Sequence, residues 1–364
     1  MSKRAFIVVF MTFNFLAFSQ EKKVLDSINF YGKISIHGAA FSDKLQLQEN
    51  APRLGTKLFK NINADWSVNG DLEFGLQFLK GANFNNDANS ASEFLANPVA
   101  NPNVLFARLA YVTFNHKTLG SISVGKQWGV YYDIGVYTDA FTLFGGSATG
   151  IYAGKTDGGW KGTGRADNSI QYRNKFGGFQ FGLQTQLFGE THGFGASAQY
   201  QFPFGLSIGT SYNTVETDQA LRDYVINVGD DSSNFIAGIK YKKDKIYAAF
   251  NFALNDDSFA IIDDNTAIAF PTYGYETLLG YDPTGNWHFE GGFNRMIEKG
   301  TEPYFDGEYR LVQYILGINY FMNPTTKLYL QSRFDDSKYV AEDVKLSVLA
   351  IGFSYDFNLG KKFN

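Results

Sequence analysis

Residues 179–187 read FQFGLQTQL, and apolar and polar side chains alternate along the whole stretch. The odd-numbered positions carry Phe, Phe, Leu, Thr and Leu, while the even-numbered positions carry Gln or Gly. Successive side chains of a β-strand point to opposite faces, so one face of this strand suits hydrocarbon and the other suits water. The same alternation returns in residues 194–202, 246–254 and 349–357. The alternation of apolar and polar residues is therefore a repeated pattern of the chain.

Sixteen such stretches occur along the chain, and we predict that they are strands joined by turns. They cover about 28–42, 50–60, 63–80, 104–116, 119–133, 165–176, 178–189, 193–202, 204–216, 233–243, 245–256, 272–282, 286–298, 308–322, 326–336 and 344–358. An even number of strands lets the last pair with the first, so that no unpaired edge meets lipid. The predicted fold class is all-β, a transmembrane antiparallel β-barrel that occupies residues 20–364 as one domain.

Two features favour a membrane barrel over a soluble β-sandwich, which also alternates. The predicted connections are short and long in turn, as in outer-membrane barrels. The short ones lie near Asn61, Lys117, Gly177, Pro203, Asp244, Pro283 and Asn323, and the long ones near Asp43, Asn89, Thr149, Asp223, Asp264, Thr301 and Asp336. Many of the 36 Phe and 22 Tyr residues cluster at strand ends, where they can form interfacial girdles. A barrel of about sixteen strands is wide enough for a water-filled channel.

The N-terminus has the pattern of a secretory signal peptide. Lys3 and Arg4 precede an apolar stretch over residues 5–18, and small residues at 17 and 19 predict cleavage before Gln20. The predicted signal peptide is thus residues 1–19. The chain has no Cys and a formal net charge of −4. Disulfides and thiolate metal sites are therefore excluded, and no basic excess points to nucleic acid.

Four segments resemble the general diffusion porins of Gram-negative bacteria. They are APRLGTKL at 51–58, FARLAYVTF at 106–114, LGSISVGKQWGVYYDIGVYTDAF at 119–141 and GRADNSIQYRN at 164–174. The resemblance implies a homotrimer of sixteen-stranded barrels in the outer membrane, in contact with lipid and lipopolysaccharide. It also implies passive diffusion of small hydrophilic solutes and ions, with no cofactor and no catalysis.

The resemblance further implies that the third external loop, about 134–164, folds into the barrel and narrows it. By motif, Arg53, Arg108 and Arg165 take wall positions of this constriction, and Asp139 is the main opposing charge. Leu143 stands where the family often has an acid. The negative side of the constriction is therefore expected to be weak.

Strand alternation and the resemblance together predict further residues of the channel. Alternation places Arg165, Asp167 and Arg173 on one face of a strand. The predicted lumen lining outside the constriction comprises Asp71, Glu73, Gln77, Asp167 and Arg173.

A trimer contact follows from the resemblance alone. In the family, the second external loop latches onto a neighbouring subunit near a basic residue that matches Lys126. Asp87 or Glu93 in the loop at 81–103 is the expected partner of this lysine. Solvated loop charges with no such contact are an equally good interpretation.

Other functions have weaker support in the sequence. An outer-membrane hydrolase would need Ser and His within hydrogen-bond reach, but His116 and His192 lie near separate connections and no catalytic motif is present. A substrate-specific porin with a saturable sugar or anion site and a soluble envelope-binding sandwich remain alternatives. Acid pairs such as Asp230-Asp231 could bind calcium, but a hydrated loop surface explains them as well, so no metal is assigned.

Overall fold

The computed structural model describes residues 24–41, 44–79, 104–151, 161–187, 191–263, 266–300, 309–338 and 343–363. The predicted signal peptide over residues 1–19 lies outside these ranges. So do Asp87 and Glu93, the expected trimer contacts of the second external loop.

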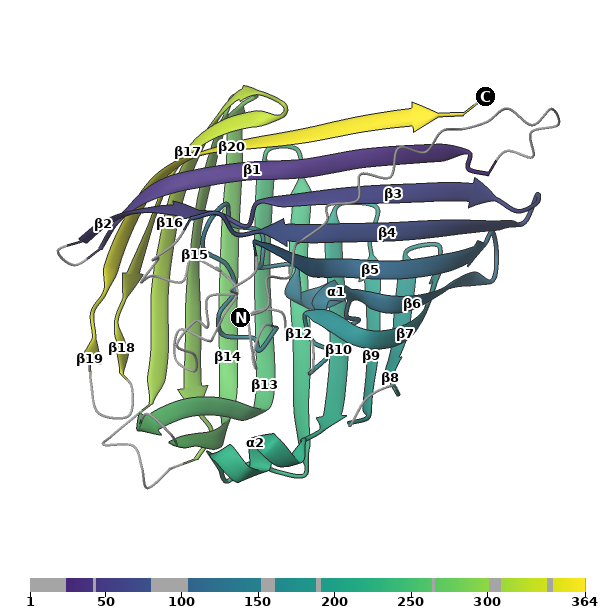
Figure 1. Cartoon of the computed structure of the whole chain (residues 1–364). Helices are drawn as coiled ribbons and strands as arrows, with labels where there is room; N and C mark the ends of the chain where they lie inside the picture. The colour runs from purple at the N-terminus through teal and green to yellow at the C-terminus, as the bar shows by residue number, and fades with distance from the viewer. Residues whose placement is uncertain are drawn as a thin grey trace, which may run out of the picture.

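The described residues form a closed antiparallel β-barrel of sixteen strands, which confirms the predicted fold class (Figure 1). Its strands are β1 (Ser27–Phe41), β3 (Arg53–Asn61), β4 (Trp66–Leu76), β5 (Leu105–His116), β6 (Gly120–Trp128), β7 (Arg165–Phe176), β8 (Phe179–Gln186), β9 (Gly193–Gln201), β10 (Leu206–Glu216), β12 (Asp231–Lys243), β13 (Ile246–Asp263), β14 (Thr266–Thr284), β15 (Trp287–Glu298), β16 (Arg310–Asn323), β17 (Thr326–Asp335) and β20 (Ser347–Lys362). Strand β20 pairs with β1 from Ser27↔Lys362 to Phe41↔Val348 and closes the wall.

Six shorter strands and helices lie within the long connections between the wall strands. They are β2 (Lys44–Glu49), α1 (Tyr132–Gly135), α2 (Gln219–Tyr224), β11 (Val225–Ile226), β18 (Ser337–Lys338) and β19 (Asp343–Val344). In the part of the chain that the structure describes, neither helix has the length and apolar character needed to cross a membrane. Helix α1 lies close to β9, β10 and β12, although its neighbours in sequence are β6 and β7.

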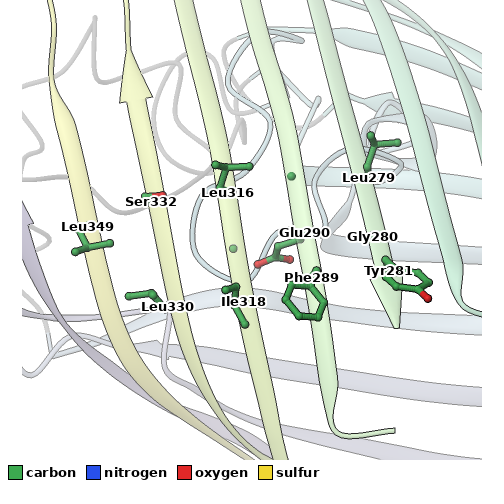
Figure 2. Close-up of a pocket in the computed structure, with 12 residues that line it drawn as sticks. Leu279, Gly280, Tyr281, Phe289, Glu290, Leu316, Ile318, Leu330, Ser332 and Leu349 are labelled. Carbon is green, nitrogen blue, oxygen red and sulfur yellow. The ribbon is translucent and has the colours of Figure 1, made fainter. Parts of the chain in front are cut away.

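The two faces of the wall differ as the alternation predicted. On β8, Leu183 is 50% exposed, whereas its neighbour Gln184 is 4% exposed. The outward rows are mostly apolar and the inward rows mostly polar, because lipid would surround the first and the barrel encloses the second. A groove of about 500 Å³ lies on the outer face and is lined by Leu279, Leu316 and Leu330, among others. Figure 2 shows these side chains on neighbouring strands of the wall. This groove belongs to the outer surface and is not part of the channel.

One hairpin is longer than predicted. We expected strands at 245–256 and 272–282 with a long loop around Asp264. Instead, β13 and β14 continue and pair up to Asp263↔Thr266, with register shifts on the way. The added residues include two apolar runs, FAII at 259–262 and AIAF at 267–270, and their β-branched and aromatic residues favour continued strand pairing. At the C-terminus, residues 358–362 likewise extend β20 and pair with the start of β1.

Candidate pore constriction

The segment at residues 129–151, which follows β6, is held by polar side chains of the inner wall. On β17, Gln331 accepts hydrogen bonds from the backbone N–H groups of Leu143 and Phe144, each at 2.7 Å. On β15, Glu290 accepts the N–H of Thr142 at 3.2 Å. The wall side chains thus replace the backbone partners that an irregular segment lacks.

Glu276 of β14 makes the densest of these contacts. Its carboxylate accepts the N–H groups of Ala148 at 2.8 Å and Thr149 at 2.9 Å, and the hydroxyl of Thr138 at 2.5 Å. Glu276 is fully buried, so water cannot replace it as the acceptor for these three donors. No motif in the sequence singled out Glu276, which is one of two acidic residues of β14 together with Asp282.

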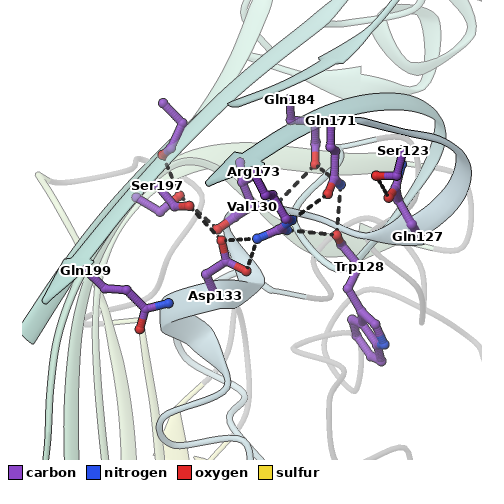
Figure 3. Close-up of polar contacts among 12 residues, drawn as sticks. Ser123, Gln127, Trp128, Val130, Asp133, Gln171, Arg173, Gln184, Ser197 and Gln199 are labelled. Carbon is purple, nitrogen blue, oxygen red and sulfur yellow. Dashed lines mark hydrogen bonds and ion pairs between the residues drawn. The ribbon is translucent and has the colours of Figure 1, made fainter. Parts of the chain in front are cut away.

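An ion pair fixes α1 to strand β7 of the wall (Figure 3). Asp133 of α1 accepts two hydrogen bonds from Arg173 of β7, one of them at 2.6 Å, and a third from Ser197 of β9 at 2.6 Å. Val130 donates its N–H to Gln184 at 3.0 Å. Arg173 was predicted in the lumen lining, but its partner Asp133 carried no signal in the sequence. A polar cavity of about 360 Å³ lies beside this pair.

The remaining contacts of the segment are apolar. Leu143 is 1% exposed and packs in a cluster with Phe41, Ile315 and Tyr329 of the wall. The side chain at the position where the resemblance leads one to expect an acid therefore anchors the segment. In the same segment, burial raises the pKa of Tyr131 well above its ordinary value, so its hydroxyl stays protonated and donates to the carbonyl of Thr149 at 2.7 Å.

On the wall, the structure brings Arg53 and Arg108 together at Glu73. The Nε atom of Arg108 donates to Glu73 at 2.7 Å, and the Nε atom of Arg53 lies 3.7 Å from the same carboxylate. Tyr31 donates its hydroxyl to Glu73 at 3.1 Å. The Glu73 side chain is 9% exposed and the Arg53 side chain 33%. The acid is thus covered by its partners, while part of the basic charge meets the interior.

Arg165 and Asp139 lie in other surroundings. Arg165 begins β7 and is buried, with its guanidinium carbon 5.3 Å from the ring centre of Trp128. Trp128 stacks on Tyr132, whose hydroxyl donates to Asp139 at 2.8 Å. Ring stacking and one hydrogen bond therefore link the neighbourhoods of Arg165 and Asp139.

The placement of Asp167 in the lumen lining is wrong. Asp167 instead forms an ion pair with Lys126 at 2.9 Å, and its side chain is 45% exposed. Lys126 is the strand partner of Ala110, which belongs to an exposed row. The cause is a register shift between β6 and β7, beside Asn168 at φ 50°, which breaks the alternation that the prediction assumed.

Two other predicted lining residues lie on β4 or just after it. Asp71 is buried and lies 3.7 Å from Lys57, whose side chain is 57% exposed. Gln77 follows β4 and is half-buried, and its N–H donates to the carbonyl of Val104 at 2.9 Å. Within the described ranges, no cluster of three or more His, Asp or Glu side chains could hold a metal ion.

Comparison with known proteins agrees with this architecture. A family model described as Gram-negative porin matches residues 6–339. Outer membrane porin N of Escherichia coli K12 is 24% identical over 377 aligned residues, which cover 91% of this chain and 92% of that protein. Outer membrane porin protein OmpD of Citrobacter koseri is 30% identical over 283 residues, which cover 69% and 73%.

Solved structures show the same fold. Salmonella typhi OmpF in complex with daunomycin matches with a TM-score of 0.75 at 21% identity, covering 91% of this chain and 97% of that one. The trimer form of Vibrio cholerae OmpT matches with a TM-score of 0.65 at 14% identity, covering 91% and 99%. From the closed barrel, the family match over nearly the whole length and the relatives, it follows that this chain belongs to the Gram-negative porin family and is a channel protein of the bacterial outer membrane.

Proposed function

We propose that small hydrophilic solutes and ions cross this barrel by passive diffusion, through a passage narrowed by the 129–151 segment. The observation that carries the proposal is that this segment is bound through Glu276, Glu290 and Gln331, whose side chains belong to the inner, polar face of the wall. The passage then runs between the segment and the wall around Arg53 and Arg108. No catalysis and no cofactor are part of this proposal.

Liposome swelling tests the mode of transport. With purified protein in the vesicles, swelling rates should fall steadily as the neutral sugar or amino acid becomes larger, and should rise in proportion to solute concentration. Diffusion without a binding step does not saturate. A rate that levels off for one solute class while others are excluded would instead support the alternative, a substrate-specific porin.

The three predicted arginines are proposed to set the ion preference, with Asp139 as the opposing charge. Replacing Arg53, Arg108 and Arg165 by alanine together should change the chloride-to-potassium permeability ratio at least about twofold, since unit charges a few ångströms from an ion act on it even in water. The ratio follows from reversal potentials under a KCl gradient. An unchanged permeability ratio in the triple variant would mean that these arginines have only a structural role.

Processing and assembly complete the proposal. Cleavage before Gln20 would remove residues 1–19, and N-terminal sequencing of the exported protein would show it.

A homotrimer is proposed because a relative of the same fold has been solved in a trimer form. Lys126 is satisfied by Asp167 within one chain, so Asp87 or Glu93 of a neighbouring subunit would have to share it.

A further inference from the structure

The row of outward side chains that crosses β14, β15, β16, β17 and β20 alternates in size. Direct strand pairing places Leu279, Gly291, Leu316, Ser332 and Leu349 at one height on these neighbouring strands. Gly291 and Ser332 are much smaller than the leucines on either side of them. All of these residues line the groove of about 500 Å³ on the outer face, which we name the outer groove (Figure 2).

The small size of Gly291 leaves space that its neighbours in the described part of the chain do not fill. A methyl group added at Gly291 would lie 3.4 Å from the Leu316 side chain and 3.7 Å from the carbonyl oxygen of Ile315, with no nearer contact beyond the adjoining residues. Both distances are ordinary van der Waals contacts, so a larger side chain would fit here. An apolar gap of this kind lacks dispersion contacts until another apolar molecule enters it.

The outer groove faces the hydrocarbon of the membrane. Leu279, Leu316 and Leu349 are exposed on the outer face of an outer-membrane barrel, so acyl chains are the molecules that this surface meets. A linear acyl chain can lie over Gly291 and Ser332 and touch the leucines on both sides. Because lipid tails are as apolar as leucine, the gain on binding comes from these close contacts. The volume of the groove is within the range of roughly 300–1,000 Å³ that small-molecule sites occupy.

One end of the outer groove reaches the side of the barrel where the turns are short. Tyr281 lines the groove near the end of β14, and only residues 285–286 separate β14 from β15. Trp287 follows this turn, and its ring centre lies 4.8 Å from that of Tyr320. Short turns lie on the periplasmic side of outer-membrane barrels, and Trp and Tyr residues gather at the level of the lipid head groups. The groove therefore opens to the periplasmic leaflet, which consists of phospholipids.

Two lysines bring positive charge to this end of the outer groove. Lys243 is exposed in the outward row at the end of β12, and its strand partner Ile246 is itself the strand partner of Tyr281. Lys245 is exposed in the next turn, and its ammonium group donates a hydrogen bond to the carbonyl oxygen of Pro283 at 2.8 Å. Basic side chains at the head-group level attract the phosphate of a lipid.

The acids beside these lysines do not cancel their charge at the outer face. Asp244 lies in the turn between the two lysines and offsets one of them. Asp282 belongs to the inward row of β14, and its carboxylate is 2.8 Å from the Nδ1 atom of His288. The charge of Asp282 is therefore directed to the inner side of the wall, and the outer side keeps a positive excess.

We infer that the outer groove binds an acyl chain of one phospholipid of the periplasmic leaflet, with the phosphate of this lipid at Lys243 and Lys245. The apolar gap at Gly291 selects the chain, and the lysines select an anionic head group. The site lies on the opposite side of the wall from the proposed passage, so the inference does not depend on the proposed diffusion function.

Native mass spectrometry of the folded protein tests the inference. The protein is released from detergent micelles that contain palmitoyl-oleoyl-phosphatidylglycerol. The wild type should keep one phospholipid per chain. Gly291→Phe should keep none, because the ring would occupy the place of the acyl chain. Lys243→Gln combined with Lys245→Gln should lower the retained fraction roughly tenfold, the scale expected for two lysines that attract an anionic lipid.

Ala196→Phe provides the matched control. Ala196 is exposed in the outward row of β9, away from the outer groove, so this variant adds the same ring to the lipid-facing surface and should keep the phospholipid. Heat-modifiable mobility on a gel verifies that each variant is folded.

Equal phospholipid retention in the wild type and in folded Gly291→Phe would overturn the inference, as would a wild type that retains none. Loss of the oligomer in Gly291→Phe without loss of lipid would show that a second copy of the chain covers the groove, and would overturn it too. Absence of conductance steps in the wild type would instead contradict the proposed function and leave the lipid count unaffected.

Discussion

Replacing Glu276 with alanine should release the 129–151 segment from β14 without opening the barrel. Two backbone N–H groups and one hydroxyl would lose their acceptor in a fully buried place. Each buried donor left without a partner costs about 1–3 kcal/mol. We expect single-channel recordings to change from steady steps to a fluctuating current of higher mean conductance, because the segment would leave its place in the passage.

Glu276→Gln is the control for this experiment. Glutamine keeps one oxygen acceptor at nearly the same size, so it should retain part of the contact and a steadier current than alanine. Limited proteolysis of the folded protein should cut within 129–151 faster in the alanine variant. Wild-type current and wild-type cleavage in Glu276→Ala would show that the segment is held without this carboxylate.

Replacing Glu73 with alanine should destabilise the barrel wall. The Arg108 side chain is 9% exposed and would keep its charge without the carboxylate 2.7 Å away. Removing one partner of a buried ion pair costs about 3–5 kcal/mol, and the water near Arg53 should reduce this figure. The temperature at which the folded gel band converts to the unfolded one should therefore fall.

The double variant Glu73→Ala with Arg108→Ala separates this cause from simple loss of packing. Removing the arginine as well removes the unpaired charge, so the double variant should unfold at a higher temperature than Glu73→Ala alone. A double variant that is less stable by the sum of the two single effects would contradict the role given to the ion pair.

Strand alternation predicted the wall of this protein well but failed at β-bulges. Strict alternation would place Arg108 in the row of Ala110 and Val112, which is exposed on the outer face. The register of β4 and β5 shifts at Glu73, so that Arg108 and Leu109 are both buried. Only the motif resemblance indicated the inward position of Arg108. At Asp167 a similar shift had the opposite effect, and the prediction from alternation was wrong.

The contacts of the 129–151 segment could not be predicted from local sequence. Glu276 is 128 positions from Ala148, and Gln331 is 188 positions from Leu143. Alternation shows that such polar side chains face inward, but it does not show which backbone groups they meet. Those partners depend on the path of an irregular segment, and irregular segments have no periodic pattern.

Along each strand of the barrel, alternate side chains face an enclosed aqueous space and the surrounding lipid. The chain contains no Cys, so single cysteines can be placed at will. Val112 is 43% exposed on the outer face of β5, and Thr113 beside it belongs to the inner row. In outer-membrane vesicles, a water-soluble, charged thiol reagent should modify Thr113→Cys and reduce its channel current, while Val112→Cys stays unmodified. Modification of Val112→Cys with protection of Thr113→Cys would contradict the account.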